Sequence, residues 1–247
     1  MRMQSIVDTA SQMVNTALAR GAGSYPSAEL ARDGYVVEPG FLPLLDVESA
    51  LRDVERFADR SITGTDVPGS RLTDRSNRQQ RDLNVRVLDG PQHLSPALER
   101  LVASGRIEQT MTRLTGRQMG VGRLTVQIDW PDTENKRGLH VDSHWPATYK
   151  AFIYLTPVVG PENGPFSVVP GSHRHRVKKV KAIAGNYLHH RSRTDLDFEY
   201  ALDDARCLLG EPGTAIFADQ RLAHAGWPGH TTGTRFMLVA YLYDSSN

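Results

Sequence analysis

Hydrophobic positions in the first part of the chain recur mainly at helical spacing. A first amphipathic segment runs from Ile6 to Leu18, and Gly21–Gly23 ends it. A short helix is expected over Ser27–Arg32, followed by a strand over 34–37. A longer helix comes next, and we expect Asp46 to cap it. The apolar face of this helix consists of Val47, Leu51, Val54 and Phe57.

Polar residues then dominate from Ser61 to Asp82. We interpret this stretch as a long loop, because loops of that length usually serve function. Two short helices are expected next, over Ser95–Ala103 and Ile107–Leu114, and Gly116 is placed to end the second. Residues 1 to about 118 therefore predict a helical layer with one long loop.

Beyond Gly120 the hydrophobic period changes from helical to alternating. In the strand expected over 121–128, one face carries Leu124, Val126 and Ile128. The opposite face carries Arg123, Thr125 and Gln127. Further strands are expected at 139–141, 149–157, 166–169, 213–217, 222–226 and 235–243. Many short strands with Gly and Pro between them favour a sandwich or barrel over a parallel βαβ sheet. We expect a single domain over 1–247, with the β-core at about 119–247.

Composition narrows the function classes. The 29 Lys and Arg residues balance 28 Asp and Glu residues, for a net charge of +1, which argues against nucleic-acid or anionic-membrane partners. The single cysteine, Cys207, excludes an intramolecular disulfide and a cysteine-only zinc site. No apolar run approaches a membrane span, and we expect no secretory signal at the N-terminus. We expect a cytoplasmic monomer or homodimer, whose nine histidines could build a metal site.

One basic insertion, residues 173–194, stands out against this balanced charge. Residues 164–194 contain seven Lys and Arg residues and no acid, and an acidic stretch follows directly. One interpretation is a cationic lid over the mouth of the β-core that attracts an anionic substrate. The alternative is a solvated insertion whose charges are neutralised by the acidic stretch.

His140-Val141-Asp142 is the one His-x-Asp sequence in the chain. On a strand, residues i and i+2 face the same side, so this imidazole and carboxylate can converge on one metal ion. His224, between two short strands near the C-terminus, is the candidate third ligand. Two histidines and one carboxylate form a facial triad, which leaves positions open on Fe(II) for a cosubstrate and dioxygen.

Arg235 follows His224 by eleven residues, at the start of the last expected strand. A loop of that length can return this side chain to the same cavity. A guanidinium binds a carboxylate bidentately, as the distal end of 2-oxoglutarate would require. The alternative for Arg235 is an exposed charge at the end of a strand.

These residues carry a resemblance to the phytanoyl-CoA dioxygenase family, a branch of the Fe(II)/2-oxoglutarate oxygenases built on a double-stranded β-helix (jelly roll, cupin-like). The matching stretches are Asp33–Leu42, His140–Asp142, Glu162–Phe166, Val168–His173, and His224 with Arg235. The resemblance spans about residues 28–243. It implies a mainly β fold with an N-terminal helical layer. It also implies that His140, Asp142 and His224 bind the iron and that Arg235 anchors the C5 carboxylate of 2-oxoglutarate.

The chain departs from the family where Gly226 and Gly229 replace a Ser or Thr and an Asn that often follow the distal histidine. A second contact to 2-oxoglutarate must then come from elsewhere, and Gln127 is the candidate, with Thr125 and Tyr154 behind it. Ordinary polar positions on a half-exposed sheet are the alternative for all three. Halogenases that resemble this family have a small residue at the position of Asp142, so Asp142 favours C–H oxidation without halogen transfer.

Tentative substrate contacts are His144, Trp145, Lys150 and Trp227, with an ordinary surface lysine as the alternative for Lys150. His173 belongs to the family's Pro-Gly-Ser-His turn, where a structural hydrogen-bonding role is more usual than a ligand role. The composition of these segments favours a polar or glycosylated natural product, as in antibiotic biosynthesis. The resemblance implies that O₂ and 2-oxoglutarate are consumed, succinate and CO₂ are released, and the substrate is hydroxylated or oxidatively cyclised.

Other functions stay open at this point. The substrate could be an acyl-CoA thioester or an amino acid, as for other enzymes of the same family. A cupin-like metal enzyme would keep the triad without using 2-oxoglutarate. A non-enzymatic module would use the basic insertion to bind a nucleic acid or another anionic surface.

Overall fold

The structure is a computed structural model that describes residues 25–61, 67–74, 85–131, 139–141, 149–175, 196–197, 200–226 and 232–245. The expected helix at 6–18 and most of the basic insertion lie outside these ranges. The α-helices are α2 (Ala28–Asp33), α3 (Leu44–Ser61), α4 (Pro96–Ala103) and α5 (Arg106–Thr115). Short 3₁₀ helices are η1 (Pro91–His93), η2 (Ser172–Arg174) and η3 (Leu202–Asp204). Within the described ranges, no helix is long and apolar enough to cross a membrane.

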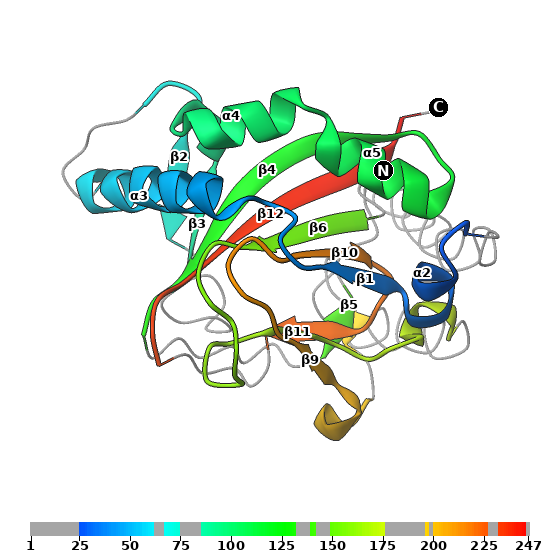
Figure 1. Cartoon of the computed structure of the whole chain (residues 1–247). Coiled ribbons are helices and arrows are strands. Elements are labelled where there is room, and N and C mark those ends of the chain that lie inside the picture. Colours follow the sequence, from blue (N-terminus) through cyan, green and yellow to red (C-terminus); the bar gives the residue numbers. More distant parts are fainter. Residues whose placement is uncertain are drawn as a thin grey trace, which may run out of the picture.

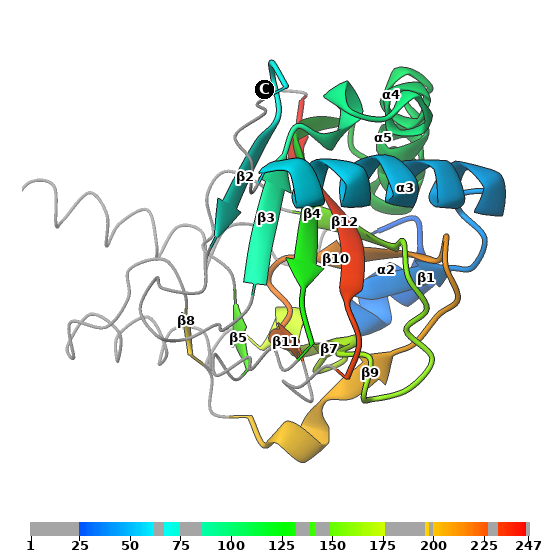
Figure 2. The same cartoon turned by 90° about the vertical axis from the view of Figure 1, so that its left-hand side faces the viewer.

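The strands form two sheets in which every neighbouring pair is antiparallel (Figures 1 and 2). The larger sheet has the order β1 (Tyr35–Glu38), β10 (Ala215–Asp219), β6 (Tyr149–Tyr154), β12 (Arg235–Asp244), β4 (Met119–Asp129), β3 (Val85–Asp89) and β2 (Arg71–Asp74). The smaller sheet has the order β8 (Leu196–Asp197), β5 (His140–Val141), β11 (His224–Gly226), β7 (Phe166–Val168) and β9 (Arg206–Leu208). This is the expected jelly roll with a helical layer.

The outer face of the larger sheet packs against α3, α4 and α5, as Figure 2 shows. The predicted alternation along β4 is confirmed, because its apolar face is fully buried in this core. The members of that face are Leu124, Val126 and Ile128. Alternating residues of β12 join them from the neighbouring strand, namely Phe236, Leu238, Ala240 and Leu242.

The inner faces of the two sheets share a second core. The larger sheet contributes Phe152, Tyr154, Met237 and Val239, and the smaller sheet contributes Phe166, Val168 and Leu208. Val141, Ala223 and Ala225 lie in a third cluster, on the other face of the smaller sheet. Since successive residues of a strand face opposite sides, His140 and His224 point toward the space between the sheets.

The short helix expected over Ser27–Arg32 is confirmed as α2. The Ser27 hydroxyl accepts a hydrogen bond from the backbone N–H of Leu30 at 3.2 Å, as an N-cap does. At the end of α5, Gly116 takes the left-handed conformation that terminates the helix.

Three expectations were wrong. Helix α3 begins at Leu44, so Asp46 lies in its first turn and is not its cap. Strand β2 lies within the stretch interpreted as a loop, and its partner β3 was not expected. Since β1, β2 and β3 all belong to the larger sheet, the sheet is not confined to residues after 118. Edge strands such as β2, whose side chains are half-buried or exposed, lack the alternating apolar pattern that identifies inner strands.

Candidate metal centre

His140 and His224 are direct partners in the ladder between β5 and β11. Their ring centroids lie 4.5 Å apart, and the exposed fractions of the two residues are 4% and 8%. Two buried imidazoles at this separation can supply two ligands to one metal ion, because each neutral ring offers one nitrogen lone pair. In the described part of the chain, no third His, Cys, Asp or Glu completes a group of three. The predicted third ligand, Asp142, lies outside that part.

The tautomer of His224 follows from its neighbour in the chain. Its Nδ1 lies 3.0 Å from the carbonyl oxygen of Leu222. A carbonyl can only accept a hydrogen bond, so Nδ1 is the donor, and in the neutral ring Nε2 carries the lone pair. Histidines that bind metals typically use such a contact to fix the ring. The arrangement therefore fits an Nε2 ligand.

The Pro-Gly-Ser-His turn holds the backbone next to His224. The Ser172 hydroxyl accepts a hydrogen bond from the N–H of Ala223 at 2.9 Å. The carbonyl oxygen of Ala223 accepts one from the N–H of Val169, also at 2.9 Å. The Pro-Gly-Ser-His turn therefore holds the backbone of the residue that precedes His224.

His173, in the same turn, is buried against the turn after α2. Gly34 has a φ of +84°, and a Cβ at this position would lie 2.5 Å from Nδ1 of His173 and 2.8 Å from Leu222. The backbone joins the same segments, because the N–H of Gly171 donates to the Asp33 carbonyl at 2.9 Å. This packing places the Asp33–Gly34 segment against the Pro-Gly-Ser-His turn.

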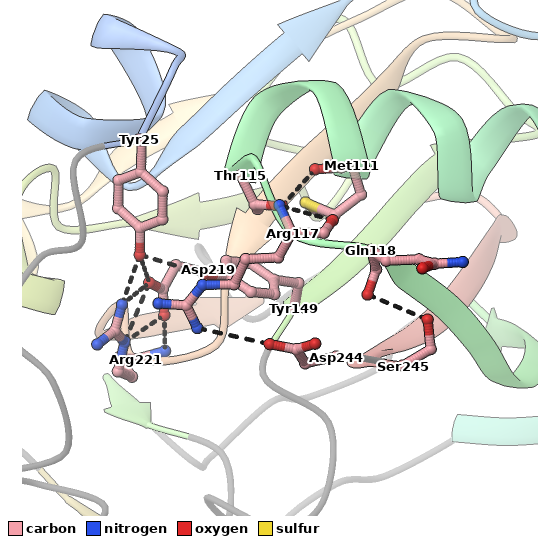
Figure 3. A network of polar contacts seen from close by, with 10 residues as sticks. All are labelled: Tyr25, Met111, Thr115, Arg117, Gln118, Tyr149, Asp219, Arg221, Asp244 and Ser245. Carbon is pink, nitrogen blue, oxygen red and sulfur yellow. Dashed lines mark hydrogen bonds and ion pairs between the residues drawn. The ribbon is translucent and has the colours of Figure 1, made fainter. Parts of the chain in front are cut away.

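A polar network anchors the turn between β10 and β11 (Figure 3). The Asp219 carboxylate is 1% exposed and accepts hydrogen bonds from the Tyr25 hydroxyl at 3.0 Å and from Nε of Arg221 at 2.9 Å. The Tyr149 hydroxyl donates to that of Tyr25 at 3.2 Å. Burial alone would raise the pKa of Asp219, but the Arg221 guanidinium outweighs burial and lowers it. Asp219 is therefore held as a carboxylate five residues before His224.

Arg235 begins β12, as expected, but it is not an exposed charge at the end of a strand. Its exposed fraction is 5%, and it is paired in register with Asp129 of β4, which is 2% exposed. Nε of Arg235 donates to Oδ2 of Asp129 at 2.8 Å, and Nη2 donates to the same oxygen. Nη1 donates to the carbonyl oxygen of Gly164. The predicted cosubstrate anchor thus has a carboxylate partner within the chain.

The Asn-Gly-Pro motif supplies the Gly164 carbonyl. The side-chain oxygen of Asn163 accepts hydrogen bonds from the N–H groups of Val159 and Gly160, at 3.0 and 2.9 Å. This closes a tight turn in which Gly164 has a φ of +65°, a conformation that favours glycine. The motif therefore places a backbone acceptor against Arg235.

The other residues expected to bind 2-oxoglutarate lie on the inner face of the larger sheet. Gln127 donates from its amide nitrogen to Oδ1 of Asp129 at 2.9 Å. The Tyr154 hydroxyl donates to the Leu208 carbonyl at 2.7 Å and accepts from the N–H of Phe166 at 3.1 Å, so it joins the two sheets. Thr125 is opposite Val239 in the ladder and is 1% exposed.

Of the four tentative substrate contacts, Lys150 alone is described. The alternative of a surface lysine is wrong, because Lys150 is only 8% exposed. Its ammonium group lies 4.7 Å from the centre of the Tyr241 ring and 5.9 Å from that of Phe152. The remaining three, His144, Trp145 and Trp227, lie outside the described residues.

The sequence reasoning missed two carboxylates of this region. Asp129 lies two positions after Gln127, so extending the alternation by one step would have placed it on the same face. Asp219 offers no such signal, because its partner Tyr25 is 194 residues away in the chain.

The family model described as phytanoyl-CoA dioxygenase matches residues 30–237. Together with the jelly roll, this match makes the protein a 2-oxoglutarate-dependent non-haem iron oxygenase that acts on small molecules. The chain belongs to the phytanoyl-CoA dioxygenase family. None of the curated proteins matches the chain.

Solved structures share the fold at low sequence identity. HygX from Streptomyces hygroscopicus, with nickel and 2-oxoglutarate bound, is 16% identical with a TM-score of 0.61, covering 88% of this chain and 85% of its own. The carbocyclase SnoK from nogalamycin biosynthesis is 19% identical with a TM-score of 0.60, covering 88% and 82%. EctD from S. alaskensis, with 2-oxoglutarate and 5-hydroxyectoine, is 18% identical with a TM-score of 0.62, covering 94% and 81%.

Proposed function

We propose that the protein uses Fe(II), 2-oxoglutarate and O₂ to oxidise a polar or glycosylated natural product, by hydroxylation or oxidative cyclisation. The observation that carries this proposal is the facing pair of buried histidines on β5 and β11. The donor set fits iron, because two imidazoles and one carboxylate are the ligands of the Fe(II) oxygenases. His140 and His224 supply the imidazoles, and Asp142, two residues after His140, supplies the carboxylate.

When bound, the iron and its cosubstrate supply the oxidising power for C–H cleavage, and the protein supplies binding, orientation and exclusion of water. Leu222 fixes the His224 ring through Nδ1. The Phe166 ring lies 5.3 Å from the His224 ring and 4.1 Å from that of Phe152, so aromatic surface shields the histidine. Arg235 binds the distal carboxylate of 2-oxoglutarate. Lys150, with His144, Trp145 and Trp227, contacts the substrate.

The substrate class is supported by the matched structures and by the composition of the segments around the site. HygX has been solved with hygromycin B bound, and SnoN, an epimerase from nogalamycin biosynthesis, with nogalamycin RO. Both share the fold of this chain, at 16% and 18% identity. Lys150 adds a buried cation to the inner face of the larger sheet, which favours a substrate with polar groups over a purely aliphatic one.

The test is 2-oxoglutarate turnover by protein loaded with Fe(II) under air, against a panel of glycosides, aromatic polyketides, amino acids and CoA esters. We expect succinate release that requires Fe(II) and is stimulated most by members of the first two classes. Product mass separates hydroxylation, which adds one oxygen atom, from cyclisation, which removes two hydrogen atoms. The NMR spectrum of the product then distinguishes cyclisation from desaturation, which has the same mass. Oxidation of substrate without stoichiometric succinate would contradict the use of 2-oxoglutarate. Stimulation by CoA esters or amino acids alone would contradict the substrate class.

A further inference from the structure

The Arg235 guanidinium is buried between the two sheets, where an unpaired charge costs much free energy because it has lost its hydration. Arg235 is 5% exposed, and a buried ion requires a partner of opposite charge or a displaced pKa. Asp129 is that partner, and it faces Arg235 across the ladder between β4 and β12. The chain therefore carries its own carboxylate where a carboxylate of 2-oxoglutarate is expected to bind.

Three of the five N–H groups of Arg235 donate hydrogen bonds within the described part of the chain, and two do not. The Nε–H and one Nη2–H are directed to Oδ2 of Asp129, and one Nη1–H is directed to the Gly164 carbonyl. One N–H remains on each terminal nitrogen. A guanidinium has five N–H donors. Arg235 therefore keeps one donor on each terminal nitrogen for a second carboxylate while it binds Asp129.

Asp129 is also held from its other side. Nε2 of Gln127 lies 2.9 Å from Oδ1 and 3.2 Å from Oδ2 of Asp129. This amide donor shares the carboxylate with Arg235, so Asp129 depends less on the guanidinium. Gln127, Asp129, Arg235 and Gly164 form one chain of hydrogen bonds from β4 through β12 to the Asn-Gly-Pro turn.

We propose that Asp129 is an internal counter-ion that sets the affinity of Arg235 for the distal carboxylate of the cosubstrate. The inference rests on the proposed role of Arg235. Asp129 stabilises the guanidinium before the cosubstrate binds, and it repels the second carboxylate that arrives beside it. It is a positioning residue, which limits the cosubstrate to the two remaining N–H groups and keeps its binding reversible.

The proposal is tested with Asp129→Asn, in which the amide keeps the shape and one acceptor but removes the negative charge. The protein is loaded with Fe(II) without oxygen and titrated by calorimetry with 2-oxoglutarate. We expect about a tenfold lower Kd for the variant, equivalent to about 1.4 kcal/mol, although its unfolding temperature without cosubstrate falls. A Kd that is unchanged or raised in a folded variant would overturn the proposal.

2-Oxovalerate is the matched control ligand, because it has the same 2-oxo acid end and no distal carboxylate. Its affinity should be the same for the parent protein and for Asp129→Asn. If the variant strengthens the binding of both ligands equally, the effect lies elsewhere in the site and the proposal is overturned.

Gln127→Met gives a test of opposite sign, which remains available if Asp129→Asn does not fold. Without the amide donor, Asp129 pairs more strongly with Arg235, so 2-oxoglutarate should bind several-fold more weakly and 2-oxovalerate should be unaffected. Weakening of both ligands would instead make Gln127 a contact to the shared 2-oxo acid end and overturn the counter-ion role.

Arg235→Ala separates the two levels of the proposal. If this variant binds 2-oxoglutarate as the parent protein does, the proposed role of Arg235 fails, and that of Asp129 fails with it. If Arg235→Ala weakens binding while Asp129→Asn does not strengthen it, only the counter-ion proposal is overturned.

Discussion

His140 and His224 face each other as direct partners in the smaller sheet, with 4.5 Å between their ring centroids. Because they belong to different strands, their approach depends on the pairing of β5 with β11 and on the contacts that hold each strand. The pairing of the two strands therefore brings the two imidazoles together. The Pro-Gly-Ser-His turn holds the backbone next to His224, because the Ser172 hydroxyl accepts a hydrogen bond from Ala223.

Replacing either histidine with alanine should abolish Fe(II) binding at micromolar metal, because one imidazole ligand is lost while the other remains. Loss of a residue that merely supports a ligand typically weakens metal binding about 10- to 100-fold, so loss of a ligand itself should weaken it more. Equilibrium dialysis of Fe(II) or Mn(II) without oxygen measures the change. The exposed His93 provides the control: His93→Ala should bind metal as the parent protein does. Metal binding retained by His224→Ala would remove that residue from the centre.

The inner-face positions of the longer strands were predictable because alternation is a local property of the sequence. The alternation predicted for β4 is confirmed, and the strand continues one residue beyond the predicted end, to Asp129 on the inner face. The placement of Asp142 on the metal stays a prediction. So do the contacts of His144, Trp145 and Trp227 with substrate.

Partners that are distant in the chain were not predictable. Tyr25 and Asp219 meet because β1 and β10 are neighbours in the sheet and α2 precedes β1. Lys150 looked like a surface residue because lysine usually is one, whereas pairing of β6 between β10 and β12 buries it. These contacts depend on strand order, which local patterns do not encode.

Gly34→Ala should destabilise the protein by more than about 2 kcal/mol, which is the upper end of the backbone penalty alone. The left-handed backbone disfavours a side chain, and the new Cβ would also collide with His173 and Leu222. Gly40 is the matched control, because its φ is +64° and a Cβ there meets nothing within 4 Å. Gly40→Ala should therefore cost only about 1–2 kcal/mol. Urea unfolding of both variants measures the difference, and equal losses would show that the close approach at Gly34 is unimportant.

Tyr154→Phe should lower the free energy of unfolding by about 1–3 kcal/mol, because it removes one partner from the buried Leu208 carbonyl and Phe166 N–H. If this hydroxyl serves the fold, the Kd for 2-oxoglutarate should stay close to that of the parent protein. Tyr243, which is 41% exposed, provides the control, and Tyr243→Phe should be neutral. A large rise in the Kd without loss of stability would instead place Tyr154 at the cosubstrate.

Asp219→Asn should destabilise the protein by about 3 kcal/mol, because it leaves the Arg221 guanidinium without its carboxylate. The 30% exposure of the Arg221 side chain keeps the loss at the lower end for a buried pair. Asp89, paired with Arg123 at the surface, is the control, and Asp89→Asn should cost less than about 1 kcal/mol. Comparable losses in the two variants would show that burial adds nothing to the Asp219 pair.

Acid should destabilise the protein by protonating Asp219. Because the pKa of Asp219 is lower in the folded protein than its ordinary value, its stabilising effect is present above about pH 4 and is lost as the pH falls through the folded-state pKa. Asp219→Asn should therefore flatten the fall of stability below about pH 4. An acid limb identical to that of the parent protein would contradict the low pKa.

Alkali should destabilise the protein through its buried tyrosines. Burial raises the pKa of Tyr154 from 10.0 to about 12, and burial together with the Asp219 carboxylate also raises those of Tyr25 and Tyr149. The unfolded chain releases these protons first, so stability is full below about pH 10 and falls as the pH rises toward 12. Tyr154 alone accounts for about 3 kcal/mol of this fall, and Tyr154→Phe should reduce its steepness. Ultraviolet titration of phenolate should show these tyrosines ionising together with unfolding. Their ionisation near pH 10 in the folded protein would show that they are accessible to water.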